Sequence, residues 1–245
     1  MSRLVYLLIS AACYFAFFIA FVYLIGFVAG FPALPTNVDK GLEGPASLAV
    51  VVDIGLIALF GLQHSIMARQ SFKMGWMKVV PRPIERSVYC LATALALAAM
   101  YAFWFPIAGT VWSVDTPALR LVLWGLFALG WLILFVATHL INHWELFGLA
   151  QAWRYFRGQA PKAPEFKTPL FYRYVRHPIY SGIFLAVWAT PEMTYSHLLL
   201  AMGFSVYLLI GIRFEERDLV ASFGETYVEY RRRVGMIVPG IGRQG

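Results

Sequence analysis

The densest run of reactive side chains in the sequence is Arg-His-Pro-Ile-Tyr-Ser-Gly at residues 176–182. Pro178 suits the first turn of a helix and pushes His177 into an extended conformation, so Arg176 and His177 are expected at a helix N-terminus. Free backbone N–H groups, the helix dipole and the guanidinium together attract a carboxylate there. Gly182 would let another segment pack closely on this first turn, because it has no Cβ. The motif therefore predicts an anion-binding position beside a close packing contact.

A pair of adjacent carboxylates, Glu215 and Glu216, ends the apolar stretch that follows this motif. Next to a hydrophobic helix, such a pair can hold the amine or the ribose hydroxyls of a ligand. The same pair can also form a solvated charge cluster with Arg213 and Arg217. Both interpretations place the carboxylates at the level of the 176–182 motif.

Three aromatic residues, Phe223, Tyr227 and Tyr230, recur at helical spacing beyond the carboxylates and mark one face of a helix. This face either covers the preceding segments as a lid or forms ordinary core. The run Arg231-Arg232-Arg233 that follows is most simply a contact with anionic lipid headgroups.

Histidines supply the other candidates for chemistry, and the sequence holds five of them: His64, His139, His143, His177 and His197. His139 and His143 have the four-residue spacing of a metal pair, but no HExxH sequence accompanies them and no metal site is predicted. Residues 142–156 carry apolar side chains at helical spacing and resemble an interfacial helix. This segment is either an amphipathic strap at the headgroups or a helix whose Asn142, His143 and Gln151 face a pocket.

The elements that must position these residues are apolar enough to cross a membrane. The 245 residues are 60% hydrophobic and 13% charged, with a mean hydropathy of +0.67, which excludes a soluble globule. Apolar runs long enough to span a bilayer lie at 4–28, 46–67, 88–105 and 119–141. Two shorter runs, 179–190 and 197–212, predict a helical hairpin that dips into the membrane and returns. The expected fold is all-α: four transmembrane helices plus the shorter hairpin, with a polar C-terminal region on the cytoplasmic side.

The basic residues predict the orientation, because Lys and Arg accumulate in cytoplasmic loops. Of the 20 lysines and arginines, all except Lys40 and Arg120 fall on one side of the predicted spans. Both termini are therefore expected in the cytoplasm. Residues 1–141 would form the four-span bundle, and residues 142–245 would add the interfacial helix, the hairpin and a C-terminal lid within one integrated domain.

The net charge and the cysteine content indicate which kinds of binding partner to expect. The net charge of +7 is explained by topology and by contacts with anionic membrane lipids, so nucleic acid is not expected as a partner. Cys13 and Cys90 both lie inside apolar runs and form no disulfide framework. No feature indicates an obligate protein partner.

Taken together, these motifs carry a resemblance to a family of enzymes. The 176–182 motif, Glu215-Glu216 and Phe-Gly-Glu-Thr-Tyr-Val-Glu-Tyr at 223–230 resemble the C-terminal signature of the isoprenylcysteine carboxyl methyltransferase superfamily of integral membrane enzymes. Gln63-His64-Ser65, Glu85-Arg86-Ser87 and the segment 142–149 resemble the bacterial methanethiol S-methyltransferases within it, which make dimethyl sulfide. That resemblance implies the bacterial inner membrane as location.

The resemblance implies S-adenosylmethionine as methyl donor, bound in a cytoplasmic cleft that the C-terminal segment closes. No GxGxxG sequence follows a strand, so helices must hold the donor. Carried over to this chain, the resemblance gives the methionyl carboxylate to Arg176 and His177, and the nucleoside edge to Tyr180 and Gly182. Glu215 or Glu216 would take the hydroxyls or the amine, and Gln151 would add a hydrogen bond.

The acceptor implied by the resemblance is a small thiol, which is mostly protonated at neutral pH because its pKa is about 8.5. Either a neutral histidine must therefore accept its proton, or a cation must stabilise the thiolate. His143 is the first candidate for this base and His64 the second, with Asn142 orienting the acceptor. Carboxyl methylation of a prenylated cysteine is the nearest alternative activity. A haem-binding membrane protein with His64 and His139 as axial ligands, and a non-catalytic scaffold, are alternatives of a different class.

Overall fold

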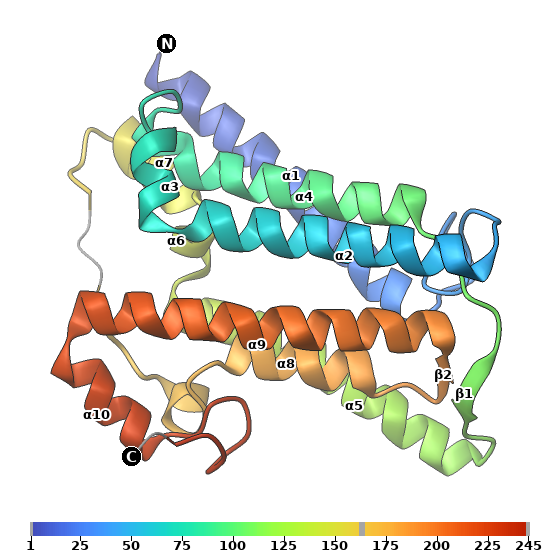
Figure 1. Cartoon of the computed structure of the whole chain (residues 1–245). Helices are drawn as coiled ribbons and strands as arrows, with labels where there is room; N and C mark the ends of the chain where they lie inside the picture. The colour runs from blue at the N-terminus through green and yellow to red at the C-terminus, as the bar shows by residue number, and fades with distance from the viewer. Residues whose placement is uncertain (1, 162–164, 244–245) are drawn as a thin grey trace. The chain divides into compact units, whose positions relative to one another are not determined.

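The structure is a computed structural model that describes residues 2–161 and 165–243. Most of the chain is helical (Figure 1). The elements in chain order are α1 (Arg3–Val28), α2 (Ala46–Ala68), α3 (Gln70–Trp76), the 3₁₀ helix η1 (Arg82–Ile84), α4 (Glu85–Phe103), β1 (Thr110–Ser113), α5 (Pro117–Ile141), α6 (His143–Leu146), α7 (Leu149–Phe156), the 3₁₀ helix η2 (Leu170–Arg173), α8 (Pro178–Trp188), β2 (Glu192–Thr194), α9 (Tyr195–Phe223) and α10 (Glu225–Arg233).

Five helical stretches among the described residues are long and apolar enough to cross a membrane: α1, α2, η1 with α4, α5 and α9. Many of their large apolar side chains stay exposed, with Leu121 74% and Val51 70% accessible. An apolar surface of this extent is stable only against lipid or another apolar partner. The expectation of an all-α fold built from membrane-crossing helices is confirmed at this level.

The chain divides into two compact units that interleave along the sequence. Unit 1 comprises residues 1–109, 142–163 and 194–200, and unit 2 comprises residues 110–141, 164–193 and 201–245. This division differs from the expected one, which kept residues 1–141 together. It arises because α5 packs against α8, 37 residues beyond its own end, so that α5 belongs with the C-terminal helices.

Unit 1 is built on α4, which packs against both α1 and α2, while α7 packs on α1. Ser87 of α4 donates a buried hydrogen bond of 2.9 Å to Ser10 of α1. At the other end of the unit the Trp104 indole donates to the Val38 carbonyl at 3.0 Å. The buried Asp53 of α2 accepts from the backbone N–H of Phe105 at 3.0 Å. These polar contacts fix the ends of the three long helices, whose apolar surfaces alone would leave their register loosely defined.

Unit 2 contains a crossing of α5 and α8 at small residues. A Cβ on Gly130 would lie 2.6 Å from the Gly182 carbonyl oxygen, and a Cβ on Gly182 would lie 2.5 Å from the Gly130 carbonyl oxygen. Such distances leave room for hydrogen alone, so the two backbones are in direct contact. Small residues at a helix crossing are the usual way in which membrane helices approach closely. The close contact expected at Gly182 is thus present, and its partner is α5.

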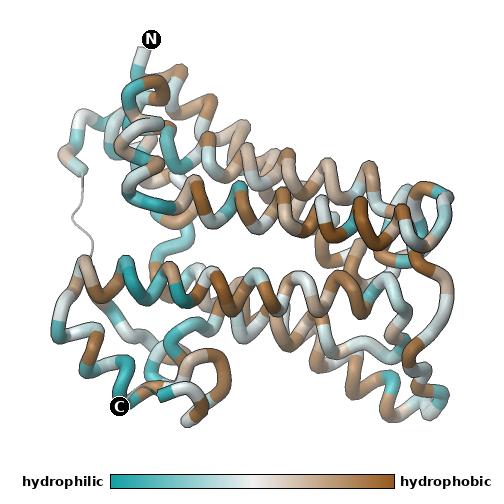
Figure 2. The backbone as a smooth tube through the Cα atoms, viewed as in Figure 1, coloured by the Kyte–Doolittle hydropathy of each residue, from teal (hydrophilic) through white to brown (hydrophobic). Residues whose placement is uncertain are grey.

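The helical hairpin differs from the expectation in its second arm. The first arm, α8, has 11 residues, but the second, α9, has 29 and continues to Phe223. The helix runs on because the polar stretch 213–217 consists of residues that favour helices, and no Gly or Pro interrupts it before Gly224. Figure 2 shows the change from apolar to polar residues along α9 towards the α10 end. The turn between α8 and α9 contains β2, which pairs with β1 from the connection between α4 and α5. This small sheet was not part of the all-α expectation.

Candidate functional site

The 176–182 motif forms the start of α8, as its proline predicts. Pro178 is the first residue of the helix, and His177 before it has a non-helical backbone with φ −126° and ψ 63°. The preceding strand-like segment runs beside the C-terminal tail. The Arg176 N–H donates to the Gly235 carbonyl at 2.8 Å, and the His177 N–H donates to the Met236 carbonyl at 3.1 Å. The tail thereby holds both functional side chains at the helix N-terminus.

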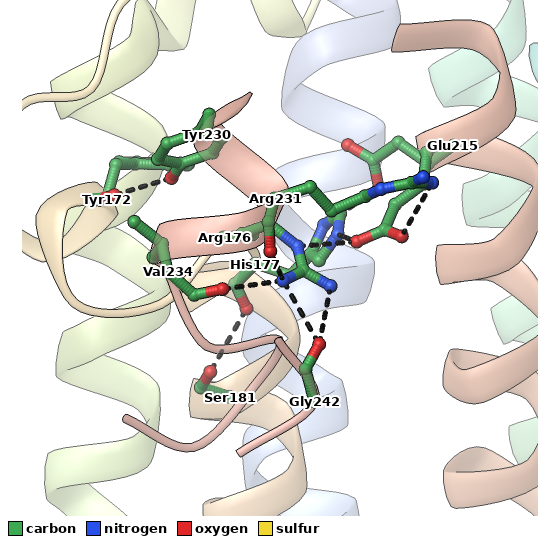
Figure 3. Close-up of polar contacts among 10 residues, drawn as sticks. Tyr172, Arg176, His177, Ser181, Glu215, Tyr230, Arg231, Val234 and Gly242 are labelled. Carbon is green, nitrogen blue, oxygen red and sulfur yellow. Dashed lines mark hydrogen bonds and ion pairs between the residues drawn. The ribbon is translucent and has the colours of Figure 1, made fainter. Parts of the chain in front are cut away.

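Arg176 is the hub of this region of unit 2 (Figure 3). Its side chain is fully buried and forms a 2.7 Å ion pair from Nε to Glu216 Oε1. Its Nη1 donates to the carbonyls of Arg231 at 3.1 Å and Val234 at 2.6 Å, and both terminal nitrogens lie 3.2 Å from the Gly242 carbonyl. The guanidinium was predicted to bind a ligand carboxylate, but its donors are instead bonded to groups of the protein.

His177 joins the two glutamates. Its Nε2 lies 3.1 Å from Glu216 Oε1, its Nδ1 lies 3.5 Å from Glu215 Oε2, and its ring stacks on Tyr180 with centroids 5.6 Å apart. Burial lowers the pKa of His177, but hydrogen bonds to Glu215 and Glu216 outweigh this effect and raise the pKa to about 9. The imidazole is therefore protonated at neutral pH and cannot act as a general base there.

The aromatic residues at the end of α9 and on α10 pack against Phe166 within unit 2. Phe166 contacts Phe223, Tyr227 and Tyr230 with ring centroids 5.3, 5.9 and 5.3 Å apart. The Tyr230 hydroxyl donates a 2.5 Å hydrogen bond to the Tyr172 carbonyl. These contacts pack the face against its neighbours within unit 2, and its role as a lid stays a prediction.

The candidates for the base lie in unit 1. Asn142 adopts a left-handed conformation with φ 117°, and its side chain caps α6 by accepting from the Glu145 N–H at 3.2 Å. His143 is 8% exposed, and its Nε2 lies 2.8 Å from the Tyr14 hydroxyl of α1. The rings of Trp144 and Phe147 stand 5.3 and 4.7 Å from the His143 ring. His143 is thus a buried imidazole with a hydroxyl partner in an aromatic surrounding.

The other polar candidates of unit 1 have their own partners. His64 lies 3.3 Å from the Thr93 hydroxyl through Nδ1, and its ring is 5.1 Å from that of Tyr89. The Gln151 amide donates to the Glu145 carbonyl at 2.9 Å. His143, His64, Asn142 and Gln151 thus belong to unit 1, whereas Arg176, His177, Tyr180, Gly182, Glu215 and Glu216 belong to unit 2.

Sequence reasoning missed Tyr14 as a partner of His143. The two residues are 129 positions apart, and a tyrosine within an apolar run carries no local signal of that contact. His139 bonds the Phe135 carbonyl of its own helix at 2.8 Å, as a histidine near a helix C-terminus can. In the described part of the chain, no group of three or more His, Cys, Asp or Glu residues is placed to hold a metal ion.

Comparison with known proteins identifies the family. The methanethiol S-methyltransferase of Crocosphaera subtropica is 45% identical over 100% of this chain and 95% of its own length. That of Mycobacterium tuberculosis is 46% identical over 98% of both chains. The chain belongs to the methanethiol S-methyltransferase family. Nurim of Xenopus laevis is more distant, at 29% identity over 86% of this chain and 80% of its own length.

Membership of this family confirms the resemblance seen in the sequence motifs. No family model and no solved structure matches the chain.

Proposed function

We propose that the protein methylates methanethiol to dimethyl sulfide, with S-adenosylmethionine as the methyl donor. The observation that carries this proposal is the 45% identity over the whole chain with a methanethiol S-methyltransferase. The buried cluster of ionised groups at the start of α8 also supports it. The described residues contain no soluble nucleotide-binding fold, so helices would have to hold the donor.

The donor would be held in unit 2 by groups that match its charges. Glu215 is partly exposed beside His177 and suits the amine or the ribose hydroxyls, while Tyr180 offers an aromatic face to the nucleoside or the sulfonium. Glu216, Arg176 and Gly182 are buried in protein contacts; we assign Arg176 and Gly182 to the frame that keeps His177, Tyr180 and Glu215 in place. Gln151 keeps its proposed role as an additional hydrogen-bonding group. When bound, S-adenosylmethionine supplies an electrophilic methyl group.

The acceptor would be activated in unit 1. We propose that His143 accepts the thiol proton, with the Tyr14 hydroxyl at 2.8 Å orienting its ring. The resulting thiolate sulfur forms a bond to the methyl carbon while the bond from that carbon to the sulfonium breaks, and the proton stays on the imidazole. Asn142 fixes the backbone before His143, and His64 is the second candidate for the base. His177 is excluded as a base because its pKa of about 9 keeps it charged.

We propose the bacterial inner membrane as the location, with both termini in the cytoplasm and the α8–α9 hairpin returning to that side. The distribution of the basic residues supports this orientation.

The direct test uses the purified protein in lipid nanodiscs with methanethiol and S-adenosylmethionine, and measures dimethyl sulfide in the headspace. Dimethyl sulfide that depends on both substrates is the expected result. A farnesylated cysteine offered in place of methanethiol tests the alternative activity. Methyl ester formation on that substrate without any dimethyl sulfide from methanethiol would contradict the proposal.

A further inference from the structure

Two polar atoms of α10 are buried without a hydrogen-bond partner among residues 2–161 and 165–243: the Tyr227 hydroxyl oxygen and Arg231 Nε. Tyr227 is only 1% exposed. Leaving a buried donor unsatisfied costs about 1–3 kcal/mol, so such groups are rare in folded proteins. Two of them on one short helix indicate a group that the described residues do not provide.

The two side chains share one face of the helix, because they are four residues apart. Arg231 Nη1 lies 3.9 Å from Glu216 Oε2, and the Arg231 carbonyl accepts from Arg176. The dashed line from the Arg231 guanidinium in Figure 3 marks this ion pair with Glu216. This face of α10 therefore borders the cluster at the start of α8.

Both atoms are hydrogen-bond donors at neutral pH. Burial, and then the negative charges of Glu216 and Glu215, raise the pKa of the Tyr227 hydroxyl well above its usual range. A guanidinium never loses its proton in proteins. The pair thus offers one O–H and one N–H, with a positive charge, to an acceptor that is itself anionic.

Arg176 cannot serve this acceptor in its place. Its side chain is fully buried, and its donors meet Glu216 and three backbone carbonyls. Arg231 is the neighbouring cation with an uncommitted donor, and its side chain is 26% exposed. Glu215, next in the chain to the Glu216 that pairs with Arg231, has a side chain that is 42% exposed and can take an ammonium group. Together these charges fit the two ends of an α-amino acid.

We propose that Arg231 and Tyr227 bind the carboxylate of the methionyl part of S-adenosylmethionine, through Arg231 Nε–H and the Tyr227 hydroxyl. This inference rests on the proposed function, and it moves the carboxylate from Arg176 to α10. It also gives Arg231 a role distinct from the lipid contact expected of the Arg231-Arg232-Arg233 run.

The test compares two ligands that differ only at the amino-acid end. S-adenosylhomocysteine carries the carboxylate and the amine, and 5′-methylthioadenosine lacks both. Titration calorimetry of the full chain in nanodiscs of zwitterionic lipid gives both dissociation constants. The Arg231→Gln and Tyr227→Phe variants are expected to bind S-adenosylhomocysteine about tenfold to a hundredfold more weakly, as for a lost hydrogen bond to a charged group. Their affinity for 5′-methylthioadenosine should stay within about twofold.

Two neighbouring substitutions are the matched controls. Arg232 pairs with Glu225 at the surface and is 55% exposed, so Arg232→Gln removes the same charge without the buried donor. The Tyr230 hydroxyl already donates to the Tyr172 carbonyl, so Tyr230→Phe removes a satisfied hydroxyl. Neither control should change the affinity for S-adenosylhomocysteine by more than about twofold.

Three outcomes would overturn the inference. Unchanged binding in Arg231→Gln and Tyr227→Phe would mean that water satisfies these donors. Equal weakening in Arg232→Gln would indicate a general effect of charge. Equal weakening for both ligands would indicate a change of structure. If the wild-type protein binds neither ligand, the proposed donor itself is wrong, which is a distinct result from wild-type binding that Arg231→Gln leaves intact.

Discussion

At the scale of residues, the start of α8 is a set of opposite charges that compensate one another inside the protein. Arg176 and Glu216 have side chains that are 0% and 6% exposed, and His177 contributes a second positive charge against Glu216 and Glu215. A buried ion is tolerated when paired and hydrogen-bonded, and it becomes costly when its partner is removed. The motif therefore stabilises the local fold at the same place where it is proposed to serve ligand binding.

Glu216→Gln tests the structural half of this arrangement. The substitution leaves the Arg176 guanidinium buried without its 2.7 Å anionic partner, and the expected loss of stability is about 3–5 kcal/mol. Thermal unfolding in detergent measures it. Glu229→Gln is the control, because Glu229 pairs with Arg233 at the surface and should contribute less than about 1 kcal/mol. Equal effects of the two substitutions would refute the importance of burial here.

His177 predicts how stability depends on pH. Its pKa is raised from 6.5 to about 9 in the folded state, so the charged imidazole adds stability of about 3 kcal/mol at most. This contribution is fully present below about pH 6.5 and is lost as the pH rises through about 9. Unfolding temperatures measured across this range should fall with rising pH, and His177→Gln should flatten that fall. A wild-type protein that is equally stable at both ends would contradict the assignment.

The proposed base predicts a separation of binding from chemistry. His143→Ala should lower the rate of methyl transfer by at least about tenfold while the affinity for S-adenosylhomocysteine is kept. Tyr14→Phe should lower the rate less and shift its pH profile, because Tyr14 acts through His143. His139→Ala is the control, since the Nδ1 atom of His139 bonds the Phe135 carbonyl within α5. If neither His143→Ala nor His64→Ala reaches a tenfold loss, another group accepts the proton.

Residue types and spacing predicted which side chains carry chemistry, but they did not predict the partners of those side chains. The proline of the motif fixed the start of α8 through local backbone restriction. Arg176 donates to the carbonyls of Val234 and Gly242, which lie in a tail some 60 residues later. These hydrogen bonds could not be predicted, because backbone acceptors have no sequence signature. The contact between Tyr14 and His143 was also not predicted, because the two residues are far apart in the sequence.

At the scale of elements, the crossing of α5 and α8 sets where the candidate donor site begins. Gly130 and Gly182 allow the two backbones to touch, and Gly182 lies only one turn into α8. The position of the Arg-His-Pro motif relative to α5 therefore depends on a direct contact between the backbones of the two helices.

Gly182→Ala should separate these two helices. The added methyl group would lie 2.5 Å from the Gly130 carbonyl oxygen and 2.9 Å from the Leu134 nitrogen, both backbone atoms. The expected cost is about 1–3 kcal/mol, with weaker donor binding as a result. Gly125→Ala is the matched control on α5, because a Cβ there meets nothing within 4 Å. Unfolding temperatures of the two variants distinguish the crossing from a general effect of alanine.

Hydropathy predicted the long helices closely, but it predicted an α9 that was too short. A pattern of apolar residues ends at Ile212, whereas the helix ends at Phe223, because helix propensity continues where hydrophobicity stops. The strands β1 and β2 could not be predicted, since three or four residues carry too little pattern to separate strand from turn.

At the scale of the whole molecule, the sequence favours one orientation in the membrane. In the proposed topology the spans and the α8–α9 hairpin return the chain to the side on which it starts, and the basic residues cluster on that side. What sequence order could not predict is the partition into two units, because the assignment of α5 to unit 2 depends on its contact with α8.

Cysteine labelling of intact cells tests this orientation. Lys40 and Lys78 are both exposed and lie on opposite predicted sides, and the natural Cys13 and Cys90 are buried. A membrane-impermeant maleimide should label Lys40→Cys in intact cells and should label Lys78→Cys only after the cells are opened. The reverse pattern would place the termini outside the cytoplasm.

The acceptors gathered by Arg176 also impose an order on biosynthesis. The carbonyl of Gly242 lies 66 positions after the guanidinium that it binds, and it leaves the ribosome after every membrane-crossing helix has been made. Since chains emerge from the N-terminus onward, a nascent protein can be fully inserted in the bilayer while this arginine still lacks three of its partners, the carbonyls of Arg231, Val234 and Gly242. The polypeptide would then gain affinity for the proposed methyl donor only after the tail has been translated.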